Sequence, residues 1–173
     1  MKICISGFAG SGKTTIAKKL SEKLKYPIIN ITFKDLAKEK NLTLEEVQKL
    51  AEKDKNIDLE LDNLIIKKAK ELDNCIISTW LGPWVIKDAD LRIFLFAPIE
   101  ERAKRIAERD KMSFEEALDH IKKRDNQNIK RYKKLYKIDI RNTDIFDLVI
   151  NTSKLSIEQT ADLVNTLAKI KLK

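Results

Sequence analysis

The segment 7–14 reads Gly-Phe-Ala-Gly-Ser-Gly-Lys-Thr, a G-x-x-x-x-G-K-T sequence that follows an apolar run and precedes an amphipathic stretch. The glycines at 7, 10 and 12 let the main chain curl so that successive N–H groups point inward toward an anion. The helix expected after the loop adds unpaired N–H groups and the positive end of its dipole. This stretch therefore predicts a strand, a phosphate-binding loop and a helix, which begin an open α/β fold.

Two side chains of this loop have the chemistry that a triphosphate requires. The ammonium group of Lys13 can reach the β- and γ-phosphates, and the hydroxyl of Thr14 can ligate Mg²⁺. The other positions contribute main-chain N–H groups or the space that such a loop needs. We therefore predict Mg²⁺ at Thr14 and ATP at Gly7, Phe8, Ala9, Gly10, Ser11, Gly12, Lys13, Thr14 and Thr15.

The chain alternates short apolar runs with helical patterns. The runs lie at residues 2–6, 27–31, 75–79, 91–97 and 148–151, and their near-continuous apolar content indicates strands covered on both faces. Helices are expected at 13–25, 33–40, 43–54, 57–72, 99–111, 113–136 and 157–170. Capping boxes are expected at three helix starts, at Thr43 with Glu46, Ser113 with Glu116 and Ser156 with Gln159. The alternation predicts a three-layer α/β domain with right-handed crossovers.

The composition limits the class of protein further. Of the 173 residues 43% are hydrophobic, which is more than a disordered chain contains, and there are only two cysteines and one histidine. These counts argue against a disulfide scaffold and a structural zinc site, and Cys4 and Cys75 are expected to be buried thiols. No apolar run approaches the roughly 20 residues of a membrane-spanning helix. We expect one cytoplasmic domain over residues 1–173 that does not bind membranes.

Two groups of arginines recur at helical spacing. Arg102, Arg105 and Arg109 are three and four residues apart, and Arg124 and Arg131 are seven apart, so each group shares a helix face. Phosphoryl transfer depends on positioning and on cations that converge from several elements. If the chain turns at 111–113, the two faces can close over ATP as a lid at about 100–137; the alternative is two solvated basic faces. The predicted catalytic residues are Lys13, Arg109, Arg124 and Arg131.

Beyond the phosphate loop, the chain resembles the archaeal-type cytidylate kinases, a family of nucleoside monophosphate kinases, over nearly its whole length. The segments that carry the likeness are 33–37, 57–62, 89–106, 124–132 and 146–153. The segment 124–132 is similar to the family's R-D-x-x-D-x-x-R sequence, with Asn128 in place of the second Asp. The resemblance implies a five-stranded parallel sheet with helices on both faces, together with helical acceptor-binding and lid insertions. It also implies Mg²⁺-dependent transfer of the γ-phosphate of ATP to CMP or dCMP by a monomer.

The acceptor side departs from the family pattern. Lys34 stands where the family usually has an arginine, residues 63–64 read Asn-Leu in place of two arginines, and residues 78–80 read Ser-Thr-Trp in place of Glu-Gly-Arg. A lysine supplies charge without the planar fork of an arginine. Ser78 stands where an acidic partner of the metal shell is expected, which predicts a weaker or water-mediated shell.

Other side chains can replace the missing acceptor contacts. Asp58 and Asp62, four residues apart in the insertion 33–72, can accept hydrogen bonds from a base amino group or a sugar hydroxyl. Trp80 follows the third apolar run, where an indole can stack on a base. The alternatives are a solvated helix face for the carboxylates and a core anchor for the indole. The predicted acceptor-binding residues are Lys34, Asp58, Asp62 and Trp80.

Three functions remain open on the sequence. The first is a kinase of CMP and dCMP, and the second is a kinase of the same fold with another small-molecule acceptor, which the departures motivate. The third is a nucleotide-dependent module that binds RNA, motivated by the net charge of +8. No aromatic-rich RNA-binding sequence accompanies the basic residues, so nucleic acid is the least favoured partner.

Overall fold

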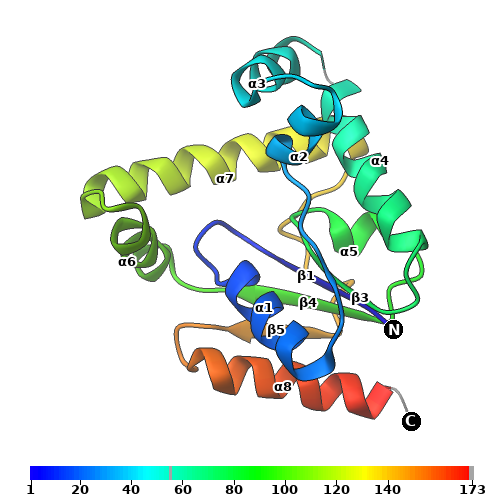
Figure 1. Cartoon of the computed structure of the whole chain (residues 1–173). Helices are drawn as coiled ribbons and strands as arrows, with labels where there is room; N and C mark the ends of the chain where they lie inside the picture. The colour runs from blue at the N-terminus through cyan, green and yellow to red at the C-terminus, as the bar shows by residue number, and fades with distance from the viewer. Residues whose placement is uncertain (55, 172–173) are drawn as a thin grey trace.

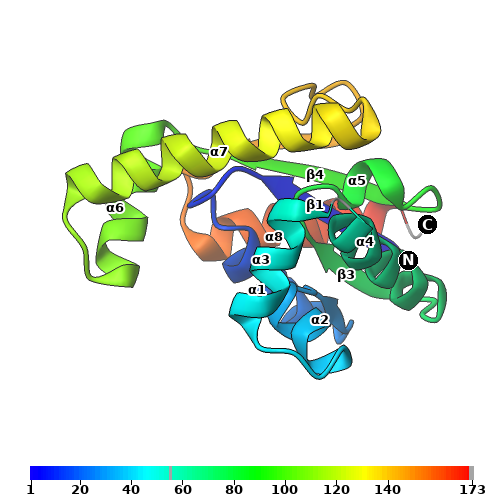
Figure 2. The same ribbon diagram turned by 90° about the horizontal axis from the view of Figure 1, so that it is seen from above.

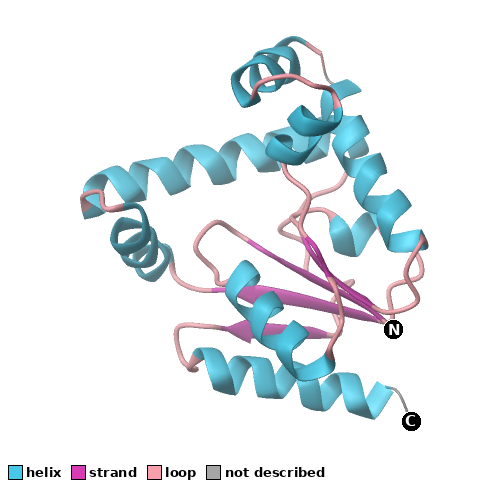
Figure 3. Cartoon of the chain, in the orientation of Figure 1, coloured by secondary structure: helices cyan, strands magenta, loops and turns pink. Residues whose placement is uncertain are grey.

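The computed structural model describes residues 1–54 and 56–171, without the side chains of residues 44, 48 and 51–53. Within this part of the chain, the strands form one parallel sheet, as predicted, and their order in the sheet is β2-β3-β1-β4-β5 (Figures 1 and 3). The strands are β1 (Lys2–Gly7), β2 (Ile28–Ile29), β3 (Cys75–Ser78), β4 (Leu91–Phe96) and β5 (Leu148–Asn151). The helices are α1 (Lys13–Leu24), α2 (Phe33–Glu39), α3 (Leu44–Lys53), α4 (Asn56–Lys70), α5 (Gly82–Val85), α6 (Ile99–Asp110), α7 (Phe114–Tyr136) and α8 (Ile157–Lys171).

Helices cover both faces of the sheet, and successive residues of β1 point to opposite faces. Ile3 and Ile5 pack in the core on the side of α1 and α8, whereas Cys4 packs with Ile77 on the side of α4. Because both faces are buried, the strands carry near-continuous apolar sequences instead of an alternating pattern. Cys4 and Cys75 are buried free thiols, as predicted.

The helix starts follow the capping rules. The Thr43 hydroxyl accepts a hydrogen bond from the Glu46 N–H at 3.2 Å, and the Glu46 carboxylate accepts one from the Thr43 N–H at 2.7 Å. The predicted boxes before α7 and α8 have the same reciprocal bonds. A further box, of Thr32 with Asp35, starts α2 and is missed by the sequence analysis. Each box satisfies main-chain donors that the first helical turn leaves free.

Two elements differ from the sequence prediction. β2 is shorter than the apolar run at 27–31, because it pairs with β3 alone at the sheet edge and the chain then turns into α2. The four-residue α5 was not predicted, because it is too short to show a helical period. The other boundaries agree with the predictions within two residues.

Two helical insertions extend from the sheet. The first insertion lies between β2 and β3 in the sequence and consists of α2, α3 and α4, in which α3 packs on both α2 and α4. The second lies between β4 and β5 in the sequence and consists of α6 and α7, which pack side by side. Figures 1 and 2 show α7 crossing the molecule from α6 toward α4, past the loop that follows β1. Among the described residues, none of the helices combines the length and the apolar character needed to cross a membrane.

Candidate active site

A cavity of about 950 Å³ opens at the carboxyl ends of the central strands, where ligands bind in open parallel sheets. Its floor is the phosphate loop between β1 and α1. One wall comes from the ends of β2 and β3 with the start of α2 and the middle of α4, and the opposite wall comes from α6 and α7. The phosphate loop therefore faces both helical insertions.

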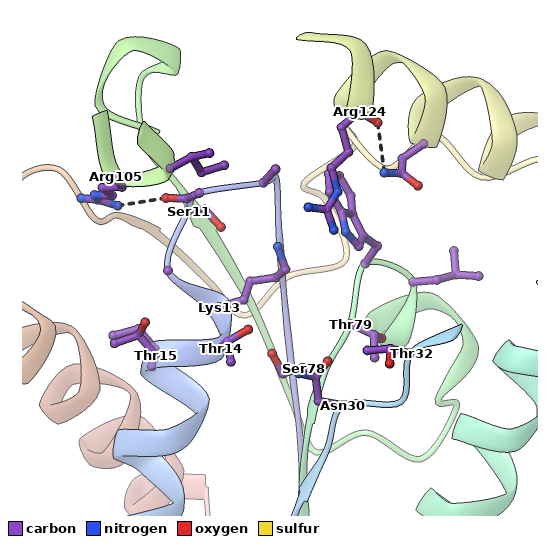
Figure 4. Close-up of a pocket in the computed structure, with 18 of the residues that line it drawn as sticks. Ser11, Lys13, Thr14, Thr15, Asn30, Thr32, Ser78, Thr79, Arg105 and Arg124 are labelled. Carbon is purple, nitrogen blue, oxygen red and sulfur yellow. Dashed lines mark hydrogen bonds between the residues drawn. The ribbon is translucent and has the colours of Figure 1, made fainter. Parts of the chain in front are cut away.

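The phosphate loop is wound as its sequence predicts. Gly12, at φ +97°, is the N-cap of α1, and it has no side chain that could cap the helix. The N–H groups of the first turn, at Lys13, Thr14 and Thr15, therefore stay available to an anion beside the positive end of the helix dipole. Figure 4 shows these three residues facing the same cavity.

Gly10→Ala is expected to lower ATP affinity at least tenfold and to destabilise the fold by about 1–3 kcal/mol. Gly10 has φ +77°, and a Cβ there would lie 2.8 Å from the carbonyl oxygen of Arg102. Calorimetric titration with ATP and thermal melting measure the two effects. In Gly12→Ala the added Cβ meets no atom within 4 Å, so this variant shows the cost of left-handed strain without the clash. Equal losses in the two variants would contradict the steric explanation.

Lys13 lies at the centre of the site. Its ammonium group donates to the carbonyl oxygens of Gly7 at 2.5 Å and Phe8 at 3.1 Å, and lies 4.8 Å from the centre of the Trp80 ring. Burial, assisted by the positive charge of Arg124, lowers the pKa of Lys13 to about 7. Phosphate oxygens are stronger acceptors for an ammonium group than neutral carbonyls. Lys13 can therefore exchange its loop carbonyls for a bound triphosphate.

Two arginines of α7 reach the cavity. Arg124 lines it and points into it from α7 (Figure 4). Arg131 also lines it, and its Nη2 forms an ion pair with Asp58 of α4 at 2.5 Å. The Nε of Arg131 is buried and has no hydrogen-bond partner among the described residues.

The arginines of α6 do not share one face over the cavity, which corrects the sequence analysis. Arg105 and Arg109 line the cavity, although the guanidinium of Arg109 is largely exposed and pairs with Asp110 at 2.6 Å. Arg102 is buried between α6 and α7, where it pairs with Asp125 at 2.7 Å. Helical spacing groups these residues, but their partners differ along the helix: Arg102 bonds Asp125 of α7, whereas Arg105 bonds Thr152 after β5.

The two predicted acceptor carboxylates lie between α4 and α7 and do not form a solvated face. Asp58 holds Arg131, and Asp62 accepts a hydrogen bond from the Tyr136 hydroxyl at 2.5 Å. Burial raises the pKa of both carboxyl groups above the ordinary range. Asp62 also lines the cavity. Their role toward an acceptor stays a prediction.

Lys34 and Trp80 occupy different positions relative to the cavity. Lys34 is exposed and lies outside the lining, next to Phe33, which is part of it. Trp80 lines the cavity and packs edge to face against Phe8, with 5.7 Å between ring centres. The indole thus combines a core contact with a surface toward the ligand, and its stacking role stays a prediction.

Several lining residues were missed by the sequence analysis. Asn30 and Thr32 follow β2, Thr79 follows β3, and Asn128 and Tyr132 face the cavity from α7. Figure 4 shows Asn30, Thr32 and Thr79 on the side of the cavity formed by β2 and β3. A polar residue directly after an apolar strand is the signal that could have found the first three.

The residues present fit a hydrated divalent cation. The Thr14 hydroxyl lines the cavity, and the Ser78 hydroxyl, which also lines it, is 3% exposed and finds no hydrogen-bond partner among the described residues. Mg²⁺ usually keeps several waters and takes few protein ligands, in addition to phosphate oxygens. No group of three metal-ligating carboxylate, thiol or imidazole side chains occurs in the described part of the chain, which suits such a site better than an all-protein one.

Asp62→Asn is expected to raise the melting temperature at pH 7, and the gain is expected to vanish as the pH falls toward 4. The raised pKa of Asp62 means that the folded protein holds this proton more tightly than the unfolded chain. The resulting stability is present at low pH and is lost as the pH rises through the raised pKa. Asparagine avoids the loss and can still accept the Tyr136 hydrogen bond.

Melting curves from pH 4 to 8 measure this effect. Asp139 is the control, because its pKa is shifted in the opposite direction: hydrogen bonds with Arg141 hold it below the usual range. Asp139→Asn is therefore expected to lower the melting temperature slightly at pH 7. A higher melting temperature at pH 7 in both variants, or in neither, would contradict a raised pKa of Asp62 in the folded protein.

Comparison with known proteins decides the family of this chain. The model of the cytidylate kinase-like family matches residues 2–154, which include the phosphate loop, both helical insertions and β5. The chain belongs to this family. It is a phosphotransferase of the nucleoside monophosphate kinase type, as predicted, and the alternative of a kinase of the same fold with a different small-molecule acceptor is not favoured.

Individual relatives agree with this assignment. The chain is 49% identical to a cytidylate kinase of Pyrococcus horikoshii over 158 residues, which cover 90% of this chain and 82% of the relative. It is 46% identical to a cytidylate kinase of Sulfolobus acidocaldarius over 167 residues, with coverage of 95% and 92%. The fold is similar to that of a shikimate kinase from Bacteroides thetaiotaomicron, with a TM-score of 0.63, 20% identity and 98% coverage of both chains.

Proposed function

We propose that this kinase transfers the γ-phosphoryl group of ATP to CMP or dCMP, with Mg²⁺. The observation that carries the proposal is the placement of Lys13 in the floor of the cavity, with Arg124 and Arg131 in one wall and the insertion α2–α4 in the other. This arrangement leaves one space that is bounded by a donor loop, two guanidinium groups and an acceptor wall. The cytidylate kinases among the relatives support a cytidine monophosphate as the acceptor.

The chain's own residues perform the transfer by position and charge. Main-chain N–H groups of the loop hold the donor phosphates, while Lys13 turns from the Gly7 and Phe8 carbonyls to the transferred group. Arg124 and Arg131 neutralise the charge that spreads over its oxygens. A phosphate oxygen of the acceptor is already anionic, so it attacks in line without a general base. One P–O bond forms to the acceptor as the bond to ADP breaks.

Thr14 would hold the Mg²⁺ ion, and the Ser78 hydroxyl is available to the water shell of the ion. When bound, the ion neutralises negative charge on the donor phosphates. The absence of a carboxylate at position 78 supports the prediction of a water-mediated shell.

We also propose different roles for the two helical insertions. Residues 33–72 would bind the acceptor, with Asp62 and Trp80 in the cavity and Lys34 at its margin, and residues of about 100–137 would act as a lid. Since residues of one chain surround the cavity, we further propose that the kinase acts as a monomer. The proposed location is the cytoplasm, and the proposed reaction involves no nucleic acid.

A turnover panel tests the proposed function. ADP formation is measured with CMP, dCMP, UMP, dUMP, AMP and GMP, each with Mg²⁺ and with excess EDTA. We expect the highest kcat/KM with CMP or dCMP and background rates in EDTA. Background ADP formation with every pyrimidine monophosphate would refute the proposal. Full activity in EDTA would refute the requirement for Mg²⁺.

A further inference from the structure

A buried ion pair joins the two lid helices beside the phosphate loop. Arg102 of α6 donates from Nη1 to Asp125 of α7 at 2.7 Å, and both residues are 7% exposed. Asp125 immediately follows Arg124 in sequence, but unlike Arg124 it is not among the residues that line the cavity. The proposed chemistry uses neither Arg102 nor Asp125.

The pair bonds both main-chain polar groups of one phosphate-loop residue, Ala9. Arg102 Nη1 donates to the carbonyl of Ala9 at 3.0 Å, and the Ala9 N–H donates to Asp125 Oδ1 at 3.4 Å. Arg102 Nε donates to the carbonyl of Ala97 at 3.1 Å, which ties the loop to the end of β4. The guanidinium also lies 5.5 Å from the centre of the Phe8 ring. The loop therefore depends on α6 and α7 for its outer turn.

Stability alone does not explain such a pair. Taking two charges out of water costs free energy, and well-packed apolar residues of similar size are often as stabilising as a buried ion pair, or more so. What an apolar pair cannot do is bond the N–H and the carbonyl of Ala9. The ion pair therefore differs from an apolar pair in that it fixes the position of Ala9 in the phosphate loop.

We propose that Arg102 and Asp125 are positioning residues, which hold the phosphate loop in its ATP-binding form and set the distance between the loop and Arg124. Because Arg124 and Asp125 are neighbours on α7, the bond from Asp125 to the loop places the Arg124 guanidinium over the phosphates. This role rests on the proposed function for its effect on turnover, but its effect on ATP binding does not depend on the acceptor.

The test replaces the ion pair by an apolar pair, in the variant Arg102→Met/Asp125→Leu. We expect the variant to stay folded, because removing two buried charges from the folded state offsets part of the hydrogen bonding that is lost. We expect the affinity for ATP with Mg²⁺, measured by calorimetry without an acceptor, to fall at least tenfold. We expect kcat to fall about 100-fold, the effect of a displacement of about 1 Å at a reacting centre.

Arg92→Met is the matched control. Arg92 donates to the main-chain carbonyls of Pro83, Ala89, Ile86 and Lys87, and so it is a structural arginine outside the phosphate loop. We expect this variant to lose stability but to keep wild-type ATP affinity. The contrast separates loop positioning from general stabilisation.

ATP affinity and kcat within twofold of wild type in a folded apolar variant would overturn the proposal. If that variant does not fold, Arg102→Lys decides, because a lysine keeps the charge opposite Asp125 but cannot bond Asp125, Ala9 and Ala97 together. A tenfold loss of ATP affinity in Arg102→Lys supports the proposal, and wild-type affinity overturns it. A wild-type protein that binds ATP but phosphorylates no pyrimidine monophosphate would refute the proposed function instead.

Discussion

Lys13→Met is expected to lower kcat by about 10²–10³-fold, the usual cost of removing one preorganised group that stabilises transition-state charge. The ammonium group bonds the loop carbonyls and lines the cavity, so its charge lies where the transferred phosphate is proposed to bind. Methionine keeps the length and the apolar contacts of the stem. Because burial lowers the pKa of Lys13, its charge carries a desolvation cost in the folded protein, and the variant is expected to melt no lower than the wild type.

Steady-state ADP formation and thermal melting measure these two outcomes. Lys18→Met is the matched control, because Lys18 lies on the same helix, is exposed and does not line the cavity. It is expected to keep wild-type turnover. A Lys13→Met protein that is folded and has kcat within threefold of wild type would exclude Lys13 from the transferred phosphate.

Arg131→Ala is expected to lower kcat by about 10²–10³-fold while ATP affinity changes less than threefold. The guanidinium lines the cavity from α7 and pairs with Asp58 of α4, in the insertion that we propose binds the acceptor. Its charge is therefore most useful when negative charge moves toward the acceptor during transfer, and a group of this kind affects kcat more than ground-state binding.

The loss of Arg131 also leaves the buried Asp58 carboxylate without its partner, which lowers stability. The double variant Asp58→Asn/Arg131→Ala removes this charge and is expected to recover the melting temperature but not kcat. Lys130→Ala, at an exposed neighbouring position outside the cavity lining, is the control for the charge of α7. Parallel losses of ATP affinity and kcat in Arg131→Ala would assign the residue to donor binding.

Local rules predicted most of the fold. The layers, the parallel sheet and three capping boxes follow from apolar runs and from residues three apart, such as Thr43 and Glu46. The phosphate loop follows from the same kind of information, since Gly10 and Gly12 meet conformational demands inside one turn of chain. These features depend on interactions between near neighbours in sequence, so sequence analysis can identify them.

The tertiary structure determined where the charged side chains lie and which partners they bind. Arg102 and Arg124 are the same residue type on neighbouring helices, yet the first is buried against the loop and the second lines the cavity. Asp58 and Asp62 share a helix face as predicted, but that face meets α7, so their bonds go to Arg131 and Tyr136.

For this protein, the sequence by itself determined the order of elements, the strand–loop–helix that holds phosphate and the family resemblance. Only the tertiary structure decided which cations meet at the cavity and which serve the packing of α6 and α7. The physical reason is that helical periodicity states which side chains share a face, whereas the partner of that face depends on contacts between segments distant in sequence. Asp125, 116 residues from Ala9 along the chain, is the clearest example.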